Sequence, residues 1–168
     1  MQSPLIVQIE RLIPTPELRI VSYATDDAQL LTAEVQAEYG RRYGGDGDIS
    51  PIDPAQFDAP DGLFVIGYVD GEPAASGGWR RGGPRGVTDA EIKRMYVRPQ
   101  FARQGHARAV LAELERTARE AGIARLVLET GLAQPEAIAL YTSSGFAAIA
   151  PFGFYAAYDD SVHLGKNL

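Results

Sequence analysis

The sequence contains no cysteine and only two histidines among its 168 residues. The absence of cysteine excludes disulfide bonds, thiolate zinc sites, iron–sulfur clusters and cysteine nucleophiles. His106 and His163 are too few for a three-histidine metal site, and neither belongs to an H-E-x-x-H motif. We therefore expect no metal site in this protein.

Long apolar runs are also absent. No run of 18 apolar residues occurs, and the N-terminus lacks a basic segment followed by a long apolar stretch. We therefore expect neither a membrane span nor a signal peptide, which favours a cytoplasmic protein. The 18 glycines and 11 prolines follow no period, so the length and the 45% hydrophobic content indicate one ordinary globular domain.

Basic residues are in the minority, with 16 Lys and Arg against 22 Asp and Glu and a net charge of −6. This balance argues against nucleic acid as the main partner. Residues 80–108 are the exception, because eight basic residues there oppose two acidic ones, a net charge of +6. Such a segment favours a local site for a polyanionic ligand, although solvated arginines on a strand and loop would have the same composition.

Hydrophobic periodicity predicts a domain that mixes strands and helices. Apolar or alternating runs predict strands at 18–23, 62–69, 73–80, 88–97 and 124–130, and two more strands joined by an aromatic-rich loop from Gly145 onward. Helical spacing predicts helices at 26–43, 106–121 and 135–144, the first of them capped by Asp26. The strands between 62 and 97 form an antiparallel meander, and the next helix leads into a parallel strand.

The most informative segment joins the strand 88–97 to the helix that begins at His106. A loop of this kind points backbone N–H groups and the positive end of the helix dipole at one spot, where phosphate binds readily. Gly105 permits close approach of the backbone, and Arg103 and Arg108 add positive charge. The loop is neither a P-loop nor a dinucleotide fingerprint, and an ordinary helix start would have the same pattern.

Three motifs resemble those of the GNAT superfamily of acyl-CoA-dependent N-acetyltransferases. Residues 102–107 (ARQGHA) are similar to its Q/R-x-x-G-x-G/A loop, with Ala102 where Gln or Arg is usual. Glu91, 14 residues before Gly105, stands where many members place a general base. Residues 134–141 (QPEAIALY), followed by Gly-Phe, are similar to the family's N-x-x-A-x-x-x-Y segment.

The resemblance covers residues 18–168 and leaves 1–17 as an N-terminal extension. It implies an α+β fold with α/β-type layers, in which helices flank a mixed, mostly antiparallel sheet of about six to seven strands with a central parallel pair. It also implies acetyl-CoA as co-substrate, with its pyrophosphate on residues 103–108 and its pantetheine arm between the parallel strands. The residues implied to bind acetyl-CoA are Met95, Tyr96, Val97, Arg103, Gln104, Gly105, His106, Ala107, Arg108 and Gln134.

Acyl transfer to an amine requires a proton acceptor, because an alkyl amine is protonated at pH 7. Glu91 is the candidate base, directly or through a water, and Tyr141 is the candidate acid that protonates the departing thiolate. Glu91 could instead pair with Lys93 or Arg94 on a strand face, and Tyr141 could be a core residue. We expect the His106 imidazole to face solvent, and His163 to be structural.

The acceptor site is less constrained by the sequence. Candidates for its wall are Tyr39, Trp79, Phe152, Phe154, Tyr155 and Tyr158, with Arg80 meeting a substrate carboxylate or the cofactor's 3′-phosphate. Large aromatic residues are more often part of the core. The sequence thus predicts an enzyme that acetylates a primary amine of a small molecule in a ternary complex. A non-catalytic acyl-CoA-binding or sensing module and a protein-lysine acetyltransferase are the alternatives, and a homodimer is compatible with either.

Overall fold

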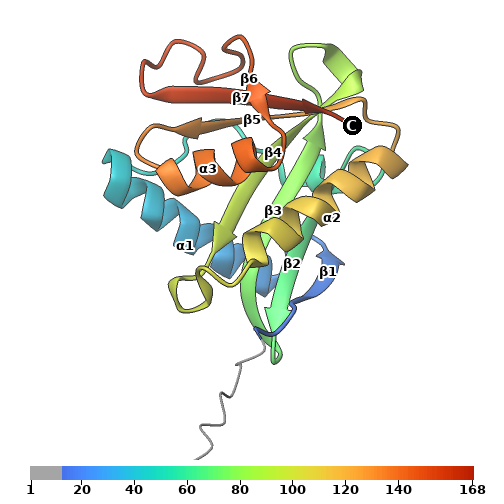
Figure 1. The fold of residues 1–168 in the computed structure, drawn as a ribbon, viewed down its shortest axis with the longest axis vertical. Coiled ribbons are helices and arrows are strands. Elements are labelled where there is room, and N and C mark those ends of the chain that lie inside the picture. Colours follow the sequence, from blue (N-terminus) through green and yellow to red (C-terminus); the bar gives the residue numbers. More distant parts are fainter. Residues whose placement is uncertain (1–12) are drawn as a thin grey trace, which may run out of the picture.

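Seven strands form one mixed sheet in the order β1-β2-β3-β4-β5-β7-β6 (Figure 1). The computed structural model describes residues 13–168, so most of the predicted N-terminal extension lies outside the described residues. The strands are β1 Glu17–Val21, β2 Gly62–Val69, β3 Glu72–Arg81, β4 Asp89–Val97, β5 Arg125–Gly131, β6 Ala147–Ala148 and β7 Ser161–Asn167. Only β4 and β5 pair in parallel within this sheet, which confirms the predicted mixed sheet with its central parallel pair.

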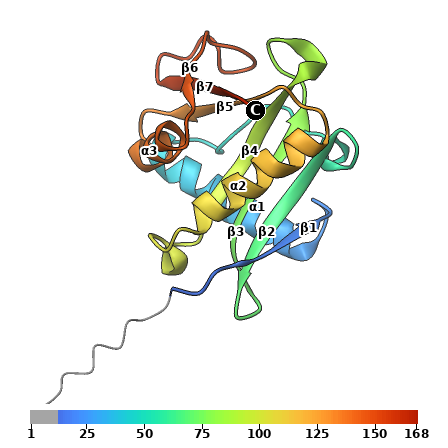
Figure 2. The ribbon, with the colours of Figure 1, turned by 45° about the vertical axis from the view of Figure 1, so that its right-hand side comes forward.

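Helices cover both faces of the sheet (Figure 2). They are α1 Asp26–Tyr43, α2 His106–Glu120 and α3 Pro135–Ser143, with single 3₁₀ turns at Pro54–Phe57, Gly86–Thr88 and Pro99–Phe101. The cap of α1 is Thr25 and not Asp26 as the sequence suggested, because the Thr25 hydroxyl accepts a hydrogen bond from the Ala28 N–H. The other predicted bounds agree to within about two residues, as expected where periodicity is strong.

The core is divided by the sheet, because successive residues of a strand point to opposite faces. Val65 of β2 packs with α2 in one apolar cluster, which α3 joins through Tyr141. The neighbouring Phe64 and Ile66 pack with α1 in a second cluster, on the other face. Within residues 13–168, no helix is long and apolar enough to cross a membrane.

The parallel strands separate part-way along their length. Their pairing ends at Glu91 and Val127, after which β4 runs on to Val97 and β5 to Gly131 without contact in the ladder. Arg94 has φ 59, a left-handed conformation that interrupts the regular pleat of β4. Figure 1 shows β4 and β5 diverging. The divergence opens a gap that is bounded by α1 and α3.

Asp89, at the start of β4, is the anchor of a buried ion pair. Its carboxylate is fully buried and accepts hydrogen bonds from Arg125 Nε and Nη2, at 2.9 and 2.7 Å, and from the Arg85 N–H at 2.9 Å. Burial alone would raise the pKa of Asp89, but these donors hold that pKa below its usual value. The ion pair therefore makes its full contribution to the free energy of unfolding above about pH 4, and this contribution is lost as pH falls through the lowered pKa of Asp89.

We expect Asp89→Ala to lower the free energy of unfolding by about 3–5 kcal/mol, because Arg125 is then left charged, buried and unpaired. Urea denaturation at pH 7 measures this loss. The matched control is Glu17→Ala, which removes the exposed ion pair with Arg19 and should leave the midpoint unchanged. Equal midpoints for the two variants would contradict a stabilising role for the buried pair.

Candidate functional site

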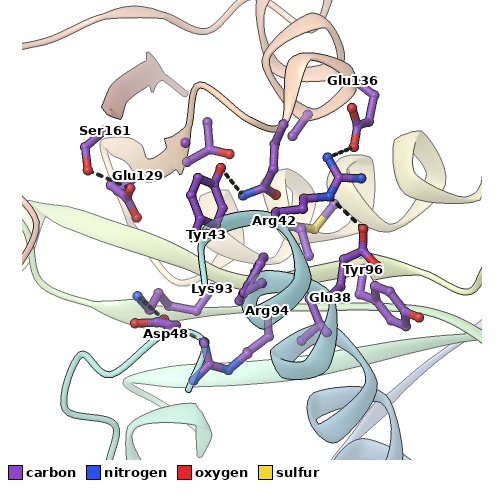
Figure 3. A pocket seen from close by; sticks show the side chains of 18 of the residues that line it. Glu38, Arg42, Tyr43, Asp48, Lys93, Arg94, Tyr96, Glu129, Glu136 and Ser161 are labelled. Carbon is purple, nitrogen blue, oxygen red and sulfur yellow. Dashed lines mark hydrogen bonds and ion pairs between the residues drawn. The ribbon is translucent and has the colours of Figure 1, made fainter. Parts of the chain in front are cut away.

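A cavity of about 960 Å³ lies where β4 and β5 separate (Figure 3). Its wall combines the C-terminal half of α1, the loop after it, the separated ends of β4 and β5, the loop before α2, α3, and the loop before β7. Ten of the residues proposed from the sequence line it: Tyr39, Met95, Tyr96, Val97, Arg103, Ala107, Gln134, Tyr141, Tyr155 and Tyr158. The sheet topology thus brings together segments that lie more than 100 residues apart in the chain.

The loop before α2 has the backbone geometry of an anion site. The N–H groups of residues 103–108 donate to no acceptor within the described part of the chain. Arg103 and Gly105 both have positive φ, 60° and 82°, which turns the chain sharply into the helix. Nothing lies within 4 Å of the position that a Cβ on Gly105 would occupy. This open space beside free donors at a helix N-terminus suits a phosphate group.

Hydrogen bonds and packing of neighbouring side chains hold the loop before α2 in place. The Arg108 guanidinium donates to the hydroxyls of Ser143 at 3.0 Å and Ser144 at 3.2 Å, so it ties the start of α2 to the end of α3. His106 is 1% exposed, with its ring against Phe101 and its Nε2 3.3 Å from Gln104 Oε1. The expectation of a solvent-facing imidazole is therefore wrong, and burial lowers the pKa of His106. The His106 ring therefore packs against Phe101 and Gln104.

Tyr141 lies both in the core and on the cavity wall. It is 5% exposed and packs edge-on against Phe146, with ring centroids 5.6 Å apart. Its hydroxyl has no hydrogen-bond partner within residues 13–168, and burial, with Tyr39 nearby, raises its pKa. The hydroxyl is therefore protonated at neutral pH and free to donate into the cavity.

Glu91 is held by neighbouring cations. Its carboxylate accepts hydrogen bonds from Arg80 Nη2 at 2.9 Å and Nε at 3.2 Å, and Lys93 Nζ is 3.8 Å away. Arg80 also donates to the Pro51 carbonyl and to Gln56, so its guanidinium supports the loop after α1. Neither Glu91 nor Arg80 lines the cavity.

Glu129 on β5 is a cavity carboxylate that the sequence interpretation missed. Its side chain accepts a hydrogen bond from the Ser161 hydroxyl at 3.1 Å (Figure 3). Burial raises the pKa of Glu129 to about 7. A lone carboxylate that directly follows the apolar residues 126–128 of a predicted central strand was the signal that could have identified it. A group that titrates near neutral pH can exchange protons with a bound molecule.

Asp48 joins the loop after α1 to β4 and to the loop before β7. It forms ion pairs with Lys93 at 3.1 Å and Arg94 at 2.6 Å, and it accepts a hydrogen bond from the Tyr155 hydroxyl at 2.7 Å. Burial alone would raise the pKa of Asp48, but Lys93, the Ser50 hydroxyl and Arg94 hold it well below its usual range. Asp48 therefore stays ionised and compensates the charges of the two cations.

Three aromatic residues proposed for the acceptor wall do not line the cavity. Phe154 is exposed beside Tyr158, and the other two are Trp79 and Phe152. Trp79 is 2% exposed, packs in the cluster beneath α2 and donates its Nε1–H to the Thr117 hydroxyl at 3.0 Å. Phe152 packs edge-on against His163, with ring centroids 5.2 Å apart. Both belong to the packing around the site, as large aromatic residues most often do. Within the described chain, no group of three or more potential ligand residues is placed to hold a metal ion.

Comparisons with known proteins agree with this geometry. Residues 29–146 match the acetyltransferase (GNAT) family. An IAA acetyltransferase of Azospirillum brasilense is 46% identical over 79 residues, which are 46% of this chain and 51% of that protein, so the match spans about half the length of that relative.

Two solved structures have a similar fold. A Klebsiella pneumoniae protein described as a candidate acyl-CoA N-acyltransferase is 27% identical, with a TM-score of 0.75 over 91% of this chain and 97% of its own. The GNAT domain of S. lividans PAT is 24% identical, with a TM-score of 0.72 over 92% of both chains, and supports the fold alone.

Proposed function

The chain belongs to the GNAT acetyltransferase family. From this premise we propose that it is an N-acetyltransferase, which transfers an acetyl group from acetyl-CoA to a primary amine of a small molecule by direct attack in a ternary complex. The main support for this proposal is one observation. A single cavity reaches from the donor-rich loop before α2 to a carboxylate that titrates near neutral pH, Glu129. A thioester bound from one end would therefore meet an amine bound from the other.

Acetyl-CoA fits the loop end of the cavity. The free N–H groups of residues 103–108 suit a pyrophosphate, and the Arg103 side chain beside them has no ion-pair partner within residues 13–168. Beyond Glu91, β4 has no ladder partner on the side of β5, so alternate N–H and C=O groups point into the gap. This edge suits the amides of an extended pantetheine arm, and a Met95 or Val97 N–H suits the thioester carbonyl. The co-substrate supplies the activated acetyl group.

Two carboxylates compete for the role of base. Glu91 is the residue predicted from the sequence, and Glu129 is the one that the geometry favours. Glu129 lines the cavity and has one hydroxyl as its hydrogen-bond donor, whereas Glu91 is held by Arg80 and Lys93. We assign the base to Glu129, and to Glu91 the positioning of Arg80 and Lys93. Tyr141 donates its proton to the departing thiolate.

We expect Tyr141→Phe to lower kcat about 10- to 1000-fold with little change in acetyl-CoA affinity, because the ring stays and only the proton donor is removed. Steady-state thiol release and calorimetric titration with acetyl-CoA measure the two quantities. Tyr68→Phe is the control, since the Tyr68 hydroxyl contacts Asp27 and does not line the cavity. Wild-type turnover of Tyr141→Phe, with chemistry shown to limit the rate, would remove Tyr141 from the mechanism.

The proposed function is tested by thiol release from acetyl-CoA across amino acids, monoamines, polyamines, aminoglycosides and short peptides. At least one small amine should accelerate release and appear as its N-acetyl derivative by mass spectrometry. Tight binding of acetyl-CoA without turnover on any acceptor would support a sensing module instead. Exclusive use of lysine side chains in peptides would support a protein acetyltransferase.

A further inference from the structure

The charges that line the cavity are segregated between its two ends. Arg42 pairs with Glu38 and Glu136, and Lys93 and Arg94 pair with Asp48. Arg103, in the loop before α2, is therefore the one lining cation without an ion pair in the described part of the chain. Figure 1 and Figure 2 both show this loop at the opposite end of the molecule from β7 and the loop before it.

The lining carboxylates that have no ion pair with any described residue lie toward that other end. They are Asp46 on the loop after α1, Glu129 on β5 and Asp160 just before β7. Asp46 and Asp160 are exposed at the mouth, whereas Glu129 lies inside. An anionic co-substrate and a cationic amine would thus be drawn to different ends of one cavity.

The acidic mouth also carries a group of exposed aromatic and apolar side chains. Tyr155 and Tyr158 line the cavity with ring centroids 5.2 Å apart, and Phe154 stacks on Tyr158 at 6.4 Å. Ile49 lies beside them, because its N–H donates to the Tyr155 hydroxyl at 3.0 Å. Ile49 is 60% exposed, and Phe154 and Tyr158 are each 49% exposed. Apolar side chains that gather at a cavity mouth, next to carboxylates, mark a surface for an apolar ligand that carries a positive charge.

Among residues 13–168, an acceptor carboxylate would find no cation in this part of the cavity that lacks an ion pair. Lys93 and Arg94, at 8% and 5% side-chain exposure, already share Asp48, and Lys93 also donates to the Ser50 hydroxyl. A carboxylate placed beside the reacting amine would lie among Asp46, Glu129 and Asp160, where like charges repel it.

From these observations, and resting on the proposed amine acetylation, we propose that the acceptor is a small primary amine attached to an aromatic or similarly large apolar body, with no carboxylate beside the amine. The ammonium group is drawn by Asp46 and Asp160 and loses its proton to Glu129. The apolar body packs on Tyr155, Tyr158 and Ile49.

Three acceptors of matched structure test this substrate class. Tyramine and tyrosine share a ring and an amine and differ by one carboxylate, and tyrosine methyl ester masks that charge. We expect kcat/KM for tyramine to exceed that for tyrosine at least 100-fold, and the methyl ester to recover most of the difference. Spermidine, a polycation without an apolar body, should be at least 10-fold poorer than tyramine.

The outcomes separate the two proposals. Acetylation of tyrosine or spermidine as efficiently as tyramine, or a clear preference for a peptide, would overturn the substrate class and leave the acetyltransferase function intact. Failure of every amine to accelerate thiol release would overturn the proposed function, and the substrate class with it.

Neighbouring aspartates provide a matched pair of variants. Asp160 lines the cavity and Asp159 does not, although both are exposed. Asp160→Asn should raise KM for tyramine about 10-fold and should reduce the ratio of kcat/KM for tyramine to kcat/KM for tyrosine. Asp159→Asn should change neither this KM nor this ratio. Tyr158→Ala should raise KM for tyramine about 10-fold and leave KM for propylamine unchanged, because propylamine has no ring to pack. Equal effects of the two aspartate variants would count against the acidic mouth as the recognition element.

Discussion

Gly105→Glu is expected to weaken acetyl-CoA binding at least 100-fold. The substitution places a carboxylate beside the free N–H groups of residues 103–108, where the pyrophosphate would lie, so that bulk and like charge both oppose binding. Isothermal titration calorimetry with acetyl-CoA measures the affinity. Wild-type affinity should itself weaken as salt rises, because salt screens the attraction that we expect between an anionic cofactor and this loop.

Gly71→Glu is the control for this experiment. Gly71, in the turn between β2 and β3, has φ 80 against 82 for Gly105, and each has open space where a Cβ would lie. Both variants therefore bear the same backbone strain, about 1–2 kcal/mol for an L-residue in the left-handed region. Gly71→Glu should bind acetyl-CoA normally. A folded Gly105→Glu protein that also binds normally would remove the loop from the cofactor site.

Local patterns were sufficient to predict most of the architecture. The Asp70-Gly71 turn between apolar runs specifies the β2–β3 hairpin, and the single apolar face of residues 106–121 specifies α2. The loop before α2 could also be predicted, because its donors belong to the backbone and depend only on a glycine and a helix start. Such features are encoded within a few consecutive residues.

Side-chain environments could not be predicted in the same way, because they depend on contacts distant in the sequence. Trp79 and Tyr155 are both aromatic, but one lies beneath α2 and the other on the cavity wall. His106 is polar and begins a helix, yet Phe101 and the loop cover it. Glu129 stands out in the sequence as a carboxylate on a predicted central strand, but its contact with Ser161 and its place on the cavity wall follow only when β5 lies between β4 and β7.

The two candidate bases can be separated by matched substitutions of Glu to Gln. Glu129→Gln keeps the shape of the side chain but removes the proton acceptor, so kcat/KM at pH 7 should fall about 100-fold or more. In the wild-type enzyme, kcat/KM should rise with pH through about 7, as the Glu129 carboxyl with its raised pKa ionises. In the variant this rise should be missing. Its deficit should shrink at high pH, where the amine loses its proton unaided.

Glu91→Gln is the counterpart, because glutamine can still accept a hydrogen bond from Arg80. We expect less than about a 10-fold loss and a pH profile parallel to that of the wild type, since a positioning residue does not exchange the proton. The opposite pattern, a large loss for Glu91→Gln and a parallel profile for Glu129→Gln, would return the base to Glu91.

Stability measurements show whether a lower kcat/KM in Glu129→Gln or Glu91→Gln comes from a catalytic defect or from a less stable fold. The pKa of Glu129 lies above its usual value in the folded protein, so the folded state binds the proton more tightly than the unfolded state does. Glu129 therefore lowers the stability of the folded protein as pH rises from its ordinary pKa to about 7, the loss is complete above that pH, and glutamine removes it. The Tm of Glu129→Gln at pH 8 should equal or exceed the wild-type Tm, whereas a purely structural glutamate would leave a less stable variant. A slow enzyme that is at least as stable as the wild type would locate the defect in proton transfer at Glu129.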